Sequence, residues 1–162
     1  MISRNKLGLS KGELEFLELS AIIHDIGKIG IHESVLHKPG QLTDEEFKII
    51  QSHVVKGSKI LEPMSRLSAL MPGVRHHHER YDGRGHPDGL KGGKIHLVAR
   101  IISVADTYDA MTTSRVYRKG LPDEVAFEEI EKGAGTQFDP KLVTSFVSFM
   151  KKKREMTNRV LS

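Results

Sequence analysis

Apolar residues in this chain recur at intervals of three and four, and no long segment alternates apolar with polar residues. Such spacing puts the apolar side chains on one face of a helix, whereas a half-buried strand needs a period of two. The 162 residues are enough to bury a core without disulfides. The sequence therefore predicts an all-α protein. We expect residues 1–162 to form one domain that belongs to, or derives from, a longer regulatory protein.

Capping signals and turns predict where the helices lie. Ser10 with Glu13 and Thr43 with Glu46 form capping boxes, which are typical of helix starts. Gly27 is expected to end the first helix. The expected helices run from Ser10 to the His24–Asp25 pair, from Thr43 to about Pro63, from Met64 to Leu70, from Val74 into the histidines that follow, from His96 to Met111, from Leu121 to Lys132, and from Pro140 through Met150.

Ionisable residues interrupt the apolar faces of these helices. His24, Asp25, His53 and Asp106 all fall on faces that should be buried, and burying a charge without a partner costs several kcal/mol. Taken singly, an inward histidine is more often a hydrogen-bonded core residue, and an inward aspartate is more often a cap or an ion-pair partner. Their combination, without counter-charges among the neighbouring apolar residues, indicates a shared ligand.

The stretch HHHERYDGRGHP, residues 76–87, adds two histidines to this set. Neutral imidazole is the commonest protein ligand of transition metals, and the chain has no cysteine, so nitrogen and oxygen atoms must hold any metal. Two divalent cations would satisfy the set, with Asp25 bridging them at a separation of roughly 3.5–4 Å. The expected ligands are His24, Asp25, His53, His77, His78 and Asp106.

The net charge is +4 and the sequence pI is about 9.3, partly because of the basic run Lys151–Arg154. No aromatic residues interleave this run, so we interpret it as a solvated helix end and predict no binding to nucleic-acid polymers. A basic surface is compatible with a small anionic substrate. No window approaches the roughly 18 apolar residues of a membrane span, and residues 1–20 lack the apolar centre of a signal peptide. These features predict a cytoplasmic protein without membrane contact.

Several segments occur in an order and spacing that resemble the HD-GYP domain, a variant of the HD phosphohydrolase superfamily linked to cyclic di-GMP hydrolysis. They are HDIGKIGI, His53, HHHERYDGRGHPDGL, VADTYDAMTTSRVYRKG, KPGQLTDEE and GTQFDP. The resemblance covers residues 8–150. It implies an HD-type helical bundle and a phosphodiesterase that opens cyclic di-GMP to pGpG, often continuing to GMP, with a binuclear or trinuclear iron or manganese centre. His and Asp sites also accept zinc, nickel or magnesium.

The resemblance implies a role for each matching residue. The family's metal ligands fall on the six residues named above. A hydroxide bridging two metals at Asp25 would attack phosphorus, while Lys28 reaches the scissile phosphate and stabilises its charge. Asp109 would orient Lys28 or a metal ligand. Arg115 and Arg118 resemble the basic pair that holds the phosphates and guanine of the substrate, although a solvated loop is the alternative reading.

The chain departs from the family pattern in two places. The GYP tripeptide is replaced by Gly85, His86 and Pro87, so we expect His86 to stack on a substrate base or to be exposed. We interpret the other loop and helix-start histidines as structural, and Glu79 likewise. HD proteins usually carry an earlier histidine about thirty residues before the His-Asp pair, which has no counterpart among the 23 residues before His24. Its absence predicts an open position at the first metal and reduced turnover.

Alternatives to the enzyme stay open. The domain is also compatible with a weakly active or inactive module that senses cyclic dinucleotides or docks onto GGDEF domains. A third possibility is an enzyme for another phosphate substrate, such as a nucleotide or a different cyclic dinucleotide.

Overall fold

A computed structural model describes residues 9–114 and 119–161, and every regular element in these ranges is a helix. The elements are α2 (Lys11–Ile23), η1 (Ile26–Gly30), α3 (Glu33–Leu36), α4 (Asp44–Gln51), α5 (His53–Leu61), η2 (Ser68–Leu70), α6 (Met71–His76), η3 (Gly92–Lys94), α7 (Leu97–Thr112), α8 (Asp123–Lys132) and α9 (Pro140–Leu161). No helix in these ranges is both long and apolar enough to cross a membrane. The prediction of an all-α protein is confirmed.

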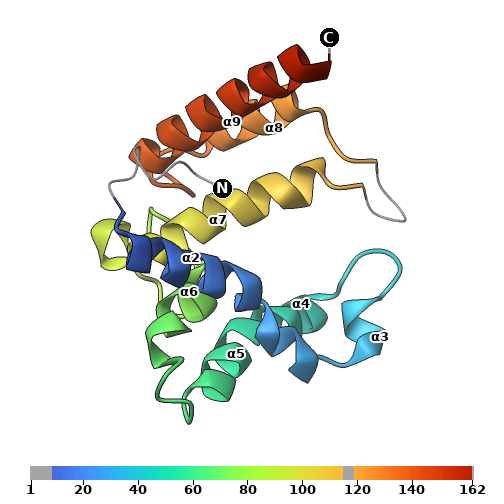
Figure 1. Cartoon of the computed structure of the whole chain (residues 1–162). Coiled ribbons are helices and arrows are strands. Elements are labelled where there is room, and N and C mark those ends of the chain that lie inside the picture. The colour runs from blue at the N-terminus through green and yellow to red at the C-terminus, as the bar shows by residue number, and fades with distance from the viewer. Residues whose placement is uncertain (1–8, 115–118, 162) are drawn as a thin grey trace.

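Helix α7 crosses the middle of the molecule, with α8 and α9 on one side and α2 and α6 on the other (Figure 1). Its apolar residues pack in both directions. Val104 joins Phe127 and Phe146 in the core shared with α8 and α9, and Ile102 joins Leu17 of α2. A helix held from two sides is a rigid support, so the polar residues near the end of α7 have a well-defined position.

A second core cluster lies where α5, α6 and η2 meet. Leu61, Leu70 and Val74 are buried there and pack against Ile23 at the end of α2. Gly27 of η1 and Gly57 of α5 allow these two segments to lie backbone to backbone. A Cβ on Gly27 would lie 1.9 Å from the carbonyl oxygen of His53. This backbone contact places the segment after α2 directly beside the start of α5.

The single helix expected from Thr43 to Pro63 is wrong, because the chain breaks at Ser52 into α4 and α5. The Ser52 hydroxyl donates to the carbonyl of Ile49 at 2.6 Å, and its backbone N–H donates to Lys48 at 3.1 Å. A serine that bonds back to the preceding turn competes with the helical ladder. The break makes His53 the first residue of α5, and its side chain is buried.

The expected helix from Met64 to Leu70 is also wrong. This segment forms turns, and only Ser68–Leu70 is helical, as the short η2. Within it Leu70 is buried and Leu67 is half-buried. A segment this short does not recover the cost of helix nucleation from so little packing.

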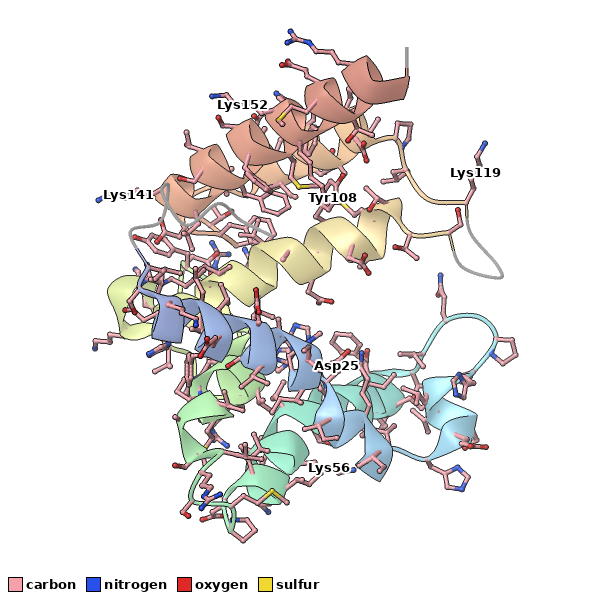
Figure 2. All side chains as sticks on the ribbon, in the orientation of Figure 1. Asp25, Lys56, Tyr108, Lys119, Lys141 and Lys152 are labelled. Atoms are coloured by element: carbon pink, nitrogen blue, oxygen red, sulfur yellow. The ribbon has the colours of Figure 1, made fainter. Side chains whose placement is uncertain are left out.

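Helix α6 starts at Met71, three residues before the expected Val74, and α8 starts at Asp123 instead of Leu121. Further boundary differences concern α2 and α9. Helix α2 stops at Ile23, so His24 caps the helix and Asp25 begins the turn into η1. Helix α9 continues past Met150 to Leu161, so the basic run lies inside a helix instead of at its end. Its side chains are exposed, and Figure 2 shows Lys152 on the outer side of α9. Lysine and arginine are good helix formers, which explains the continuation.

Candidate metal centre

The His24–Asp25 pair lies at the end of α2, where the chain turns toward α5. The Nδ1 atom of His24 lies 2.6 Å from the carbonyl oxygen of Ala21. Asp25 has φ −96° and ψ 8° and starts η1, whose close contact with α5 holds its carboxylate against the start of that helix. Figure 2 shows Asp25 near the centre of the molecule, below α7 and beside the turn into η1.

His53, the first residue of α5, is buried at 2% exposure. Its Nδ1 atom lies 2.7 Å from the carbonyl oxygen of Ile50, and its Nε2 atom lies 3.2 Å from Oδ1 of Asp25. The first ring nitrogen is thus held by the backbone of α4, and the second faces the carboxylate that follows α2.

His77 and His78 follow α6 directly. His77 is buried, with Nδ1 3.0 Å from the carbonyl oxygen of Val74. Its Nε2 atom lies 3.4 Å from Nε2 of His53 and 3.9 Å from Oδ1 of Asp25. The ring of His78 lies 4.2 Å from that of His77 and 5.1 Å from that of His53, centroid to centroid. Both adjacent histidines thus face one cluster.

Asp106 closes the cluster from α7. Its Oδ1 atom lies 3.6 Å from Nε2 of His24, and that same nitrogen lies 3.5 Å from Oδ2 of Asp25. The structure therefore brings the six expected ligands together from the ends of α2 and α6, the start of α5 and the middle of α7. That they bind metal stays a prediction.

The donor set fits divalent cations. A carbonyl oxygen only accepts hydrogen bonds, so the Nδ1 atoms of His24, His53 and His77 carry the hydrogen and their Nε2 lone pairs are free. The Nε2 atom of His24 is buried and has no hydrogen-bond partner among the described residues. An orphaned buried acceptor is costly, and a cation would satisfy it.

The ligand atoms form two overlapping groups. Those of His53, His77 and His78 lie within 4.8 Å of one another, and so do those of His24, Asp25 and His77. Asp25 lies between the groups, since its two oxygens face His53 and His24 respectively. This arrangement is compatible with two neighbouring cations that share a carboxylate.

Burial keeps part of the imidazole cluster neutral. Burial, with the neighbouring histidines, lowers the pKa of His77 to about 3 and that of His78 to about 4. Burial alone would raise the pKa of Asp25, but the His53 ring and the Lys28 ammonium outweigh it and lower that pKa. The neighbouring His24 ring likewise outweighs burial and lowers the pKa of Asp106. Neutral imidazoles and ionised carboxylates are the forms that bind cations.

We expect the metal-free protein to lose stability as the pH falls from 6.5 to 4.5. In this window the unfolded chain protonates His77 and His78, whereas the folded chain, with pKa values of about 3 and 4, does not. The free energy of unfolding therefore falls, by an amount on the order of 4 kcal/mol for the two groups together. Burial lowers the pKa of His24, but Asp106, the Ala21 carbonyl and Asp25 together outweigh it, and the net shift is upward. The contribution of His24 to the free energy of unfolding is therefore fully present below pH 6.5 and does not change between pH 6.5 and 4.5.

Urea unfolding of the metal-free protein at both pH values measures this loss. His78→Asn removes one of the two titrating groups and should show a smaller drop. Stability that stays constant or rises toward pH 4.5 would contradict the assignment of neutral buried histidines.

Lys28 and Asp109 occupy different surroundings. The ammonium of Lys28 pairs with Oδ2 of Asp25, and the side chain is 40% exposed, so it lies at the edge of the cluster where a substrate can reach it. Asp109 is exposed, and its carboxylate accepts a hydrogen bond from the Thr113 hydroxyl at 3.2 Å. The contact expected between Asp109 and Lys28 or a metal ligand is not among those of the described residues. Arg115 and Arg118 lie outside the described residues.

His86 lies closer to the cluster than most other loop histidines. Its ring stacks on that of His78 at 5.1 Å and 22°, and its Nδ1 atom lies 3.4 Å from the Gln51 amide nitrogen. Its Nε2 atom is buried without a hydrogen-bond partner among the described residues. Its role in substrate binding stays a prediction.

Some residues that shape the site were given no role by sequence reasoning. Gly27 was interpreted only as a helix end, although its missing side chain permits the contact with α5. Glu79 was expected to be structural, and its buried carboxylate accepts the backbone N–H groups of Asp88 and Leu90 at 2.7 and 3.0 Å. Gln137 belongs to the GTQFDP segment, which was the only available signal for it.

Comparison with known families agrees with this geometry. Residues 3–142 match the HD domain family. The chain belongs to the HD domain family. The HD domain is of the HD-GYP type, as its motifs predicted, and the family relationship accounts for the His-Asp pair at the centre of the cluster.

Curated relatives resemble this HD domain over most of its length. It is 39% identical over 158 residues to the cyclic di-GMP phosphodiesterase of Thermotoga maritima, covering 95% of this chain and 42% of that protein. It is 40% identical over 146 residues to the response regulator RpfG of Xanthomonas campestris, named a cyclic di-GMP phosphodiesterase, covering 88% and 38%. It is 36% identical over 136 residues to the 3'3'-cGAMP-specific phosphodiesterase 3 of Vibrio cholerae, covering 84% and 30%. The HD domain thus spans less than half of each of these relatives.

Two solved structures share the fold. The cyclic GMP-AMP-specific phosphodiesterase V-cGAP3 of Vibrio cholerae superposes with a TM-score of 0.67 at 22% identity, covering 96% of this chain and 44% of that one. An HDG"Y"P protein from Bdellovibrio bacteriovorus superposes with a TM-score of 0.71 at 18% identity, covering 91% and 47%. These likenesses establish the helical HD architecture.

Proposed function

We propose that this HD domain hydrolyses a phosphodiester bond of a cyclic dinucleotide, with cyclic di-GMP as the first substrate to test, using two divalent cations. The observation that carries the proposal is the convergence of four imidazoles and two carboxylates on one cluster. Relatives of about 40% identity that carry the name cyclic di-GMP phosphodiesterase support the choice of substrate. The resemblance to HD-GYP domains favours iron or manganese, and zinc, nickel or magnesium would also accept these nitrogen and oxygen ligands.

The six ligands can be divided between two cations, one on each side of the Asp25 carboxylate. We assign one cation to His24, Asp25 and Asp106, and the other to Asp25 together with the histidines on the far side of its carboxylate. Those histidines are His53, His77 and His78. Bound cations supply Lewis acidity at the phosphoryl oxygens and an activated water at neutral pH.

The protein's own groups position the substrate. Lys28 stands at the exposed edge of the cluster and pairs with Asp25, from where its ammonium can donate to a non-bridging phosphate oxygen as negative charge develops there. We propose that Arg115 and Arg118 hold the remaining phosphate and base. Opening one phosphodiester of cyclic di-GMP gives pGpG, and a second cleavage gives GMP. A cytoplasmic location and docking onto GGDEF domains stay predictions.

The direct test incubates the purified protein with cyclic di-GMP and manganese or ferrous iron and separates the products by chromatography. Linear pGpG or GMP is the expected product. Tight binding of cyclic di-GMP without product would indicate a sensor of cyclic di-GMP and not an enzyme. The absence of both binding and product would reject cyclic di-GMP as the ligand and leave docking or another phosphate substrate.

Lys28→Met should lower kcat about 100-fold while metal content stays unchanged. The ammonium is expected to act on charge that develops in the transition state, and removing one such donor typically costs about 10²–10³ in kcat. Lys59→Met, on the exposed side of α5, removes the same charge away from the cluster and should leave kcat unchanged. An unaltered kcat in Lys28→Met, measured at saturating substrate, would remove Lys28 from the proposed mechanism.

A further inference from the structure

A cavity of about 300 Å³ adjoins the metal cluster, between α7 and the segment that follows α6. His78 and Asp106, two of the expected ligands, form the wall nearest the cluster, and Met111 extends the lining along α7. Gln137 lines it from the turn before α9. A phosphate held at the cluster would therefore leave its attached nucleoside at the mouth of this cavity.

The size of the cavity suits a single nucleoside. Small-molecule sites usually occupy roughly 300–1,000 Å³, so this one lies at the lower end and cannot hold a whole cyclic dinucleotide. Its lining is mostly polar, and the apolar side chains of Ala110 and Met111 form one part of it along α7. Glu79 also lines it, but its carboxylate is buried and already accepts two backbone N–H groups. A lining that pairs an apolar surface with directed polar groups is compatible with a planar base that carries hydrogen-bonding edges.

The backbone holds Gln137 firmly against this cavity. Its N–H donates to the carbonyl of Gly133 at 2.9 Å, and its own carbonyl accepts the N–H of Tyr81 at 3.1 Å. The neighbouring Thr136 carbonyl accepts the N–H of Asp82 at 2.8 Å. These bonds tie the turn before α9 to the segment after α6. The side-chain amide is half-buried and makes no hydrogen bond to any described residue, so it is available to a ligand.

Arg80 also lines the cavity and has a planar guanidinium. Its guanidinium is held by Asp82, with Nε 3.2 Å from Oδ1 and NH2 2.8 Å from Oδ2. Because the pair fixes the plane and balances the charge, Arg80 can stack on an aromatic base without a second anion.

We propose that this cavity binds one purine base of the cyclic dinucleotide and that Gln137 reads the Watson–Crick edge of that base. This inference rests on the proposed function. A primary amide offers one acceptor and one donor group. It can accept from N1–H and donate to O6 of guanine, or, after rotating, accept from N6–H and donate to N1 of adenine. Gln137 therefore makes the wild-type cavity tolerant of both purines.

Gln137→Glu tests this reading because a carboxylate only accepts hydrogen bonds. Guanine presents two donors to it, N1–H and N2–H, whereas adenine presents the lone pair of N1. The ratio of kcat/KM for cyclic di-GMP to kcat/KM for cyclic di-AMP should rise about tenfold or more, as expected for one bidentate base contact. Cyclic di-AMP is chosen because both of its bases are adenine, so the cavity receives adenine in either orientation of the substrate. Gln41→Glu, at an exposed loop position, adds the same charge and should leave the ratio at the wild-type value.

The outcomes separate this inference from the proposed function. If the wild type cleaves neither dinucleotide, the proposed function fails. If the wild type cleaves them and Gln137→Glu keeps the wild-type ratio, base reading by Gln137 is overturned. Should the glutamate variant not fold, Gln137→Leu serves instead. That variant is expected to raise KM about tenfold for both dinucleotides at unchanged metal content, and an unchanged KM would overturn the inference.

Discussion

Asp25→Asn should abolish activity and lower metal affinity by more than about 100-fold, because losing only an outer partner of a metal ligand already costs about 10–100-fold. The Asp25 carboxylate faces His53 with one oxygen and His24 with the other. An amide keeps the shape but brings no charge, and its NH2 group cannot ligate a cation. One proposed cation would therefore lose the oxygen ligand that this side chain supplies, and the other would keep only a neutral amide oxygen. Elemental analysis and calorimetric titration with manganese measure the effect.

Asp44→Asn is the matched control for this experiment. Asp44 is an exposed residue in the first turn of α4, so its replacement should leave metal content and turnover unchanged. If Asp25→Asn retained the wild-type metal content, Asp25 would not be a shared ligand, and the division of the cations between the two groups would have to be abandoned.

Gly27→Ala should destabilise the fold by more than about 3 kcal/mol, the upper range for overpacked cores. The added Cβ would lie 1.9 Å from the carbonyl oxygen of His53 and 2.5 Å from the backbone nitrogen of Gly57. Both are backbone atoms that cannot rotate away, so η1 and α5 must separate. That separation also moves Asp25 away from His53, and metal affinity should fall together with stability.

Gly12→Ala provides the comparison, since nothing lies within 4 Å of a Cβ at this exposed position in α2. The same change there should stabilise the protein by about 0.5–1 kcal/mol, because alanine loses less backbone freedom in a helix. Chemical denaturation of both variants gives the two free energies. A Gly27→Ala protein as stable as the wild type would show that η1 does not pack on α5 as described.

The helices that were predicted well are those whose ends carry local signals. Ser10 and Thr43 form complete capping boxes, and the bonds that make them span only three residues. The break at Ser52 carried no such signal, because the apolar spacing continues through it from Ile50 to Val54. A serine at this position is compatible with a continuous helix and equally with the end of one. In the structure α4 ends before Ser52, and His53 packs into the core at the start of α5.

The candidate site likewise contains residues that the sequence predicted and residues that it did not. The residue types and the faces of His24, His53 and Asp106 follow from sequence, since helical periodicity decides which side chains point inward. The sequence did not identify Gln137 as a site residue, because a glutamine in a turn belongs to no periodic pattern. Its position depends on hydrogen bonds to Tyr81, more than fifty residues earlier in the chain.

By itself, the sequence determined the all-helical class and the residues that could serve as ligands, since both depend on the chemistry of a residue and its near neighbours. The tertiary structure alone decided how the inward histidines and aspartates meet, where α4 ends and α5 begins, and which cavity adjoins the cluster. Those features depend on backbone contacts such as that of Gly27 with His53, and contacts between distant segments form only when the whole core packs.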